Sequence, residues 1–286
     1  LMVSKGAKTR GSLDLEARLS REPVVERLTL KAPGLDARGR ITTREGGGLE
    51  KAEFERVVAG DWLDAAVTLT GRGKGALNVA LTGGSLDMRR MPEGGDAGGG
   101  GPITVRLDRL RLSEGIALTD LRGEFGSRGG FNGRFVAAVN DMALIEGVVA
   151  PAEAGSAFRI TSENAGAVMA AAGIFDKGRG GSLDMTLFPR GPKGEYNGSA
   201  TFTRLRVQGA PALAELLSAV SVVGLLEQMN GEGLAFNNGE VRFILTPKAV
   251  EITQGSAVGA SLGISFAGLY LNGSGRIDLQ GVISPI

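Results

Sequence analysis

The chain has 286 residues, 32 basic and 31 acidic side chains, a formal net charge of +1, and neither cysteine nor histidine. Without thiol or imidazole groups, disulfides, the usual nucleophile–base pairs and the common zinc sites cannot be built. Charges of both signs are mixed along the chain, so no basic face is available for nucleic acid. We therefore expect a non-enzymatic protein with no catalytic residue, no metal, no cofactor and no nucleic-acid partner.

Short runs with an apolar residue at every second position begin near the N-terminus. They occupy residues 13–19, 25–30, 66–70, 77–81 and 103–107, and this period of two is typical of strands with one apolar and one polar face. Glycine, with 47 residues, is used about twice as often as the average of roughly 7% and separates most of these runs. It is typical here of turns, bulges and close backbone approach.

The stretch Met91–Pro102 (MPEGGDAGGGGP) has no apolar period and is typical of a flexible loop. It separates an N-terminal part of the sheet, residues 1–95, from a C-terminal part, residues 103–286, with the Gly-rich loop at 96–102. Further strand-like runs follow at 121–125, 131–139, 144–149, 158–160, 183–187 and 196–207. Their spacing of roughly 8 to 12 residues favours antiparallel neighbours joined by hairpins.

Two short helices interrupt the strands. The first is expected near 162–172, with Ser162 as its N-cap and Gly173 as its stop. The second, near 211–229, is apolar on nearly every side, and it could cap a groove, dock on a partner or fill a core. Its candidate capping residues are Leu213, Leu216, Leu217, Val220 and Val223.

The C-terminal strands carry the candidate site, because their apolar positions could form a continuous lane with few charges. The alternative is an ordinary closed core against the two helices. The candidate lining residues by parity are Val241, Phe243, Leu245, Ile252, Leu262, Ile264, Phe266, Leu269, Leu271, Ile277 and Leu279. The predicted fold is mainly β, an antiparallel, twisted and curved sheet that forms an open groove or half-barrel with two short helices.

The short motif Gly-Ser-Leu-Asp occurs three times and contains Asp14, Asp87 and Asp184. We interpret these carboxylates as belonging to solvated strand faces or turns. The N-terminus has no signal-peptide pattern, and no apolar run is long enough to span a bilayer comfortably. The chain begins in mid-pattern, so we expect it to be a segment of a longer protein.

The block Val207–Leu226, the glycine-led strands at 231–236 and 255–264, and the terminal Gly275–Gly281 resemble the C-terminal region of the AsmA-like superfamily, closest to its YhdP branch. Upstream, Asp61–Gly73, Gly83–Asp87 and Glu163–Gly166 are similar to the same family. The resemblance covers most of the chain and thins in the first fifty residues.

This resemblance implies a bridge-like lipid transfer protein in the periplasm of a Gram-negative bacterium, tethered to the inner membrane by a helix that lies outside this chain. Such a protein would bind phospholipid acyl chains in an apolar β-groove and conduct them between the inner and outer membranes, with possible contact to the outer membrane. The alternative is an envelope-assembly or chaperone-like module that engages outer-membrane proteins by strand pairing. The family supplies no catalytic residue.

Overall fold

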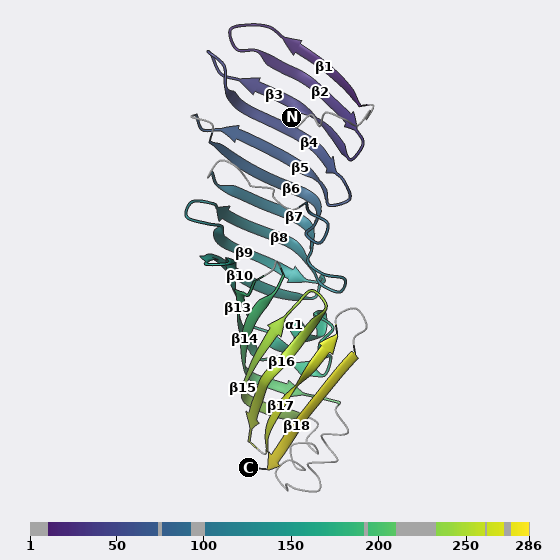
Figure 1. Cartoon of the computed structure of the whole chain (residues 1–286), viewed down its shortest axis with the longest axis vertical. Helices are drawn as coiled ribbons and strands as arrows, with labels where there is room; N and C mark the ends of the chain where they lie inside the picture. The colour runs from purple at the N-terminus through teal and green to yellow at the C-terminus, as the bar shows by residue number, and fades with distance from the viewer. Residues whose placement is uncertain are drawn as a thin grey trace. The chain divides into compact units, whose positions relative to one another are not determined.

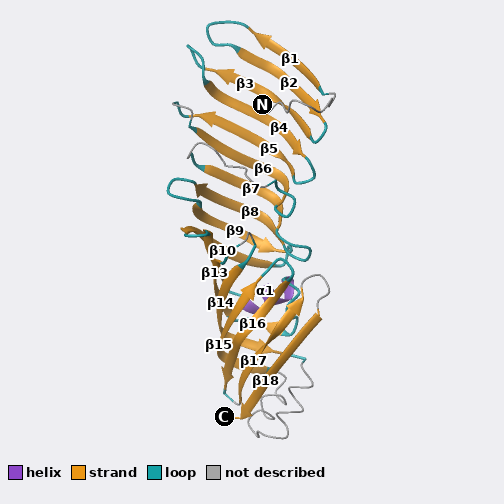
Figure 2. Cartoon of the chain, in the orientation of Figure 1, coloured by secondary structure: helices purple, strands orange, loops and turns teal. Residues whose placement is uncertain are grey.

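The computed structural model describes residues 11–73, 76–92, 101–191, 194–209, 233–260, 262–271 and 276–285. Within these residues the chain forms 18 strands and one helix, so the predicted mainly β fold is confirmed (Figure 2). The second predicted helix, near 211–229, lies outside the described residues, as do its five candidate capping residues.

The chain divides into two compact units. Unit 1 comprises Leu1–Leu112 and Asp120–Arg128, and unit 2 comprises Ser113–Thr119 and Gly129–Ile286. The division therefore falls around β8 (Ala117–Gly126), whereas the sequence suggested a boundary at the Gly-rich loop, 96–102.

Unit 1 is a sheet whose strands lie side by side in chain order (Figure 1). Strands β1 to β6 pair antiparallel through hairpins, as predicted. The strands are β1 (Ser12–Arg18), β2 (Val24–Ala32), β3 (Leu35–Thr43), β4 (Leu49–Ala59), β5 (Leu63–Gly71), β6 (Leu77–Asp87) and β7 (Ile103–Arg111).

One pairing in unit 1 departs from the hairpin pattern. Strands β6 and β7 run parallel, with Val79 opposite Ile103 and Leu86 opposite Leu110. A parallel pair needs a long connection to return the chain to the same end of the sheet. The 15 residues between the end of β6 at Asp87 and the start of β7 at Ile103 are numerous enough for such a return.

Unit 2 is also built of antiparallel strands, and each strand from β13 to β18 pairs with the next. Strand β10 lies between β9 and β11, and β13 pairs with β11. The strands are β9 (Asn132–Val139), β10 (Ala143–Ala152), β11 (Gly155–Ser162), β12 (Gly178–Arg179), β13 (Ser182–Pro189), β14 (Tyr196–Val207), β15 (Leu234–Leu245), β16 (Ala249–Gly259), β17 (Leu262–Leu271) and β18 (Arg276–Pro285).

The sheets are curved and stay open, as predicted. In the part of the chain that the structure describes, each unit ends in an outer strand with one free edge. Among these residues, β1 of unit 1 has only β2 as a neighbour, and β18 of unit 2 has only β17. No helix among the described residues is long and apolar enough to cross a bilayer.

The helix α1 (Ala165–Ala171) begins two residues later than the sequence suggested. Its N-cap is Asn164, whose side-chain oxygen accepts a hydrogen bond from the backbone N–H of Ala167 at 3.0 Å. The prediction of Ser162 as N-cap is wrong, because the Ser162 hydroxyl donates to the carbonyl of Leu144 at 2.6 Å. At the other end, the Asn140 side-chain amide donates to the carbonyl of Ala171 at 2.7 Å.

The core of unit 2 forms where its sheet bends around α1 (Figure 2). Ala165 of the helix is fully buried, and Val168 and Met169 pack against residues from β13 to β17. Strands that would lie far apart in a flat sheet thus share one cluster. The buried members are Ala165, Leu183, Phe202, Leu205, Val207, Leu234, Phe236, Ala257 and Leu262.

Candidate functional site

A row of apolar residues crosses one face of the sheet in unit 1. Directly opposed residues of neighbouring strands share a face, so the pairings trace the row from one strand to the next. We call it the central apolar row, and its members are Leu15, Leu28, Gly39, Phe54, Val67, Leu81 and Val105. A second row beside it is also apolar and consists of Val25, Ile41, Ala52, Leu69, Val79 and Ile103.

The row is long compared with a lipid tail. Neighbouring strands lie about 4.8 Å apart, so a row across seven strands extends roughly 30 Å. A bilayer core with two opposed layers of acyl chains has about the same thickness. The central apolar row is therefore about twice as long as one membrane-embedded acyl chain.

The opposite face of unit 1, which we call the polar face, carries the charges. Arg56 donates to both carboxylate oxygens of Asp64, at 2.7 and 2.6 Å, and these bonds hold the pKa of Asp64 below its ordinary value. Lys51 and Arg40 bind Glu53 at 2.6 Å each, and their hydrogen bonds lower its pKa. These charges all lie on the polar face, and the central apolar row on the other face contains no ionisable side chain.

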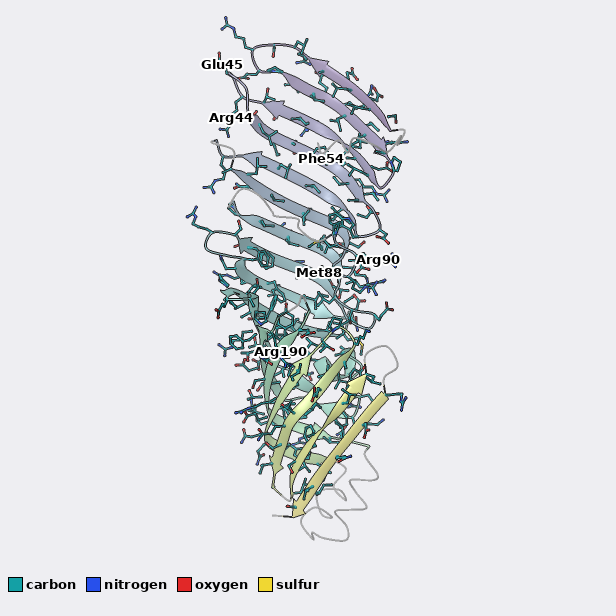
Figure 3. The ribbon with its side chains drawn as sticks, viewed as in Figure 1. Arg44, Glu45, Phe54, Met88, Arg90 and Arg190 are labelled. Carbon is teal, nitrogen blue, oxygen red and sulfur yellow. The ribbon has the colours of Figure 1, made fainter. Side chains whose placement is uncertain are left out.

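Among the described residues, no second layer packs on the apolar face of β1 to β6, whereas at β7 the last member of the row, Val105, is buried at 8% exposure. Each strand from β1 to β7 makes its extensive contacts only with the strands beside it in the sheet. The small residues Ala52 and Ala65 are buried between larger neighbours, whereas Phe54 and Val67 are only half-buried. At the outer strand β1, Leu13 and Leu15 are 62% and 52% exposed. In Figure 3, Phe54 lies within this sheet, whereas Arg44 and Glu45 lie at the β3–β4 turn.

In unit 2, phenylalanine rings reach across the inner face of the sheet, which is the face toward α1, and cover glycines on the next strand. Phe202 lies opposite Gly239, and a Cβ atom added to that glycine would meet the ring at 2.0 Å. The same holds for Phe243 over Gly198, Phe135 over Gly147 and Phe266 over Gly255, at 2.2, 2.2 and 2.5 Å. A ring placed in this way covers backbone that would otherwise be exposed.

Most of the predicted lining residues lie on this inner face. The register brings together Phe243 with Ile252, Leu245 with Val250, and Val241 with Gly255 and Phe266. Val241 and Ile264 pack against the core around α1. Leu279 of β18 shares the inner face and is 46% exposed. For Ile277 the structure gives only the backbone pairing with Tyr270.

Three of the predicted lining residues need correction. Leu269 and Leu271 pair with Glu251 and Ala249, so they lie on the face opposite to Phe266. Side chains alternate between the two faces along β17, so Leu262, Phe266 and Tyr270 share the inner face. Leu269 and Leu271 are offset from them by one residue and therefore point to the other face. Leu262 has the correct orientation but is 1% exposed inside the core, where it cannot line an open groove.

The apolar face of unit 1 was missed as a candidate site, although its signal was present. The alternation at 66–70 and 77–81 predicts strands, but it does not show which apolar positions of neighbouring strands lie opposite one another. That assignment requires the register, which sequence parity does not supply.

The candidate carboxylates occupy the expected polar positions. Asp184 accepts from Arg159 at 3.0 and 2.6 Å, and Asp87 accepts from Arg89 at 2.9 and 2.7 Å. Asp14 pairs with Thr29 on the polar face of unit 1. In the part of the chain that the structure describes, no three acidic side chains gather in a way that could hold a metal ion.

No family model matches the chain, and no curated protein or solved structure matches it significantly. The family resemblance therefore stays a prediction, and function has to be argued from the side chains. Chemically, an apolar sheet face without charge and without a covering layer can take up hydrocarbon.

Proposed function

We propose that the protein binds phospholipid acyl chains on the apolar inner surfaces of its open sheets and conducts them along these surfaces without chemistry. The observation that carries the proposal is the apolar face of β1 to β6 in unit 1, over which no other described element packs. In a monomer that works in water, an apolar face of this extent marks a surface that another apolar molecule covers.

The energetics favour a hydrocarbon ligand. Each methylene group removed from water contributes about 0.8 kcal/mol, so a tail that covers even part of the central apolar row gains several kcal/mol. Apolar contacts discriminate poorly between tails that differ by one methylene. We therefore expect several phospholipids to bind, in agreement with transport between the inner and outer membranes of a Gram-negative envelope, which the family resemblance implies.

A matched pair of variants tests the proposal. Val67 and Thr68 are neighbours on β5 that lie on opposite faces of the sheet. We expect lipid extraction and native mass spectrometry to find co-purified phospholipid in the parent protein and in Thr68→Asp, and much less in Val67→Asp. Equal lipid content in the two folded variants, or a parent protein free of lipid, would contradict the proposal.

Strand pairing with outer-membrane proteins is the second candidate function. It is favoured by β18, whose outer edge has no partner strand among the described residues and whose Leu279, Val282 and Ile283 are 46%, 64% and 38% exposed. Such an edge can accept another strand. A lipid-free protein that binds unfolded outer-membrane strands would favour this function over the first.

A further inference from the structure

Unit 1 contains a pocket at the ends of β4 to β7 that the apolar face does not explain. The pocket has a volume of about 320 Å³, and its lining includes Trp62, Ser85, Arg109 and Arg111. The chain contains a single tryptophan, so Trp62 is also a unique optical reporter for this place in the fold.

The register explains why these side chains meet. Ser85 of β6 lies opposite Asp64 of β5 and Arg109 of β7, on the polar face of the sheet. Asp87 lies opposite Arg111 on the same face. The turn before β5 is fixed to the end of β6, because the backbone N–H of Asp87 donates to the carbonyl of Trp62 at 2.7 Å.

The charges of the pocket favour an anion. Each of its carboxylates already accepts hydrogen bonds from an arginine: Asp64 from Arg56, Asp87 from Arg89, and Asp61 from Arg90, which lies beyond the end of β6 (Figure 3). Arg109 and Arg111 add two cationic side chains to the lining. A guanidinium has five N–H donors, so one protein partner does not exhaust its capacity.

The lining also has an apolar part. Trp62 and Val58 both border the pocket. An indole ring offers a flat apolar surface on which a carbon skeleton can pack. The pocket is thus suited to a ligand with an anionic end and a small organic body.

We propose that this pocket binds a phosphate ester, with the phosphate oxygens held by Arg109, Arg111 and the Ser85 hydroxyl and the organic part packed on Trp62. Planar guanidinium groups bind phosphate in a bidentate manner, and phosphate has enough oxygens to accept from all three side chains. The source of the ester is either the head of a phospholipid or a water-soluble phosphate ester. The pocket lies on the polar face, so its occupancy does not depend on lipid tails reaching the central apolar row.

The fluorescence of Trp62 tests the proposal directly, with glycerol 3-phosphate as the probe. We expect a saturable change in emission that Arg111→Gln weakens by at least about tenfold. The matched control is Arg106→Gln, which removes an exposed arginine from the same strand outside the pocket and should leave the titration unchanged. If Arg111→Gln does not fold, Ser85→Phe, which fills the pocket, should abolish the response instead.

A second comparison identifies the source of the ester. A short-chain phosphatidylglycerol, used below its micelle concentration, should bind more tightly than glycerol 3-phosphate if the ligand is a lipid head, and equally if it is a soluble ester. No saturable response to either probe, or a response that sodium sulfate at the same ionic strength reproduces in full, overturns the proposal. Val67→Asp separates the two proposals, because it should remove lipid from the apolar face and leave glycerol 3-phosphate binding intact.

Discussion

Phenylalanine and glycine occupy directly opposed positions in four residue pairs on three strand pairs of unit 2, and this pairing explains part of the high glycine content. A side chain at any of these glycines would collide with a ring. The sequence suggested that glycine served turns, bulges and close approach. Coverage by an aromatic ring on the next strand is a particular form of close approach, and only the register reveals it.

Substitution of Gly239 tests this interpretation. We expect Gly239→Ala to destabilise the protein by about 1–2 kcal/mol, because Phe202, which is 7% exposed in the core, must move to admit the methyl group. The loss of unfolded-state freedom offsets a part of that cost. Urea denaturation measures the effect.

Two further variants serve as controls for this substitution. Gly115→Ala, where an added Cβ has no atom within 4 Å, should change stability by less than about 0.5 kcal/mol. In the Phe202→Leu background, Gly239→Ala should cost less than it does beside Phe202. An equal cost in both backgrounds would show that the ring is not the cause.

At the scale of single elements, α1 shows how a local signal can be displaced by tertiary structure. Ser162 and Asn164 are both suitable N-cap residues, and the sequence alone favoured the serine. The serine hydroxyl instead bonds to Leu144 on β10, which leaves the cap to Asn164. The choice depends on a strand that is distant in sequence.

Removal of the cap should therefore weaken unit 2. We expect Asn164→Ala to cost about 0.5–2 kcal/mol in chemical denaturation, because the backbone N–H of Ala167 loses its acceptor. Asn164→Asp, which keeps an acceptor oxygen, should retain most of the stability. If Asn164→Ala is neutral, α1 is held by its packing and not by this hydrogen bond.

At the scale of the whole molecule, alternation in the sequence was sufficient to predict a mainly β, antiparallel and open fold. It did not predict the parallel pairing of β6 with β7, because side chains alternate with a period of two in parallel and antiparallel strands alike. It also placed the lipid lane in the C-terminal strands, where α1 covers part of the inner face. The apolar face of unit 1 is less covered than the inner face of unit 2. Strand parity does not predict this difference, because coverage depends on which elements pack together.

This difference affects the choice of test positions. Ile264 packs against the core around α1, so a charge there would destabilise unit 2 whether or not lipid binds. The half-buried residues of β5 avoid this ambiguity, because only the neighbouring strands contact them extensively.

A photo-crosslinking scan along β5 in living Gram-negative cells tests the central claim most directly. With the crosslinking amino acid placed in turn at Val67, Thr68, Leu69 and Thr70, we predict phospholipid adducts at Val67 and Leu69, on the apolar face, and none above background at the two threonines. Adducts that appear at all four positions alike, or at none of them, would contradict the account.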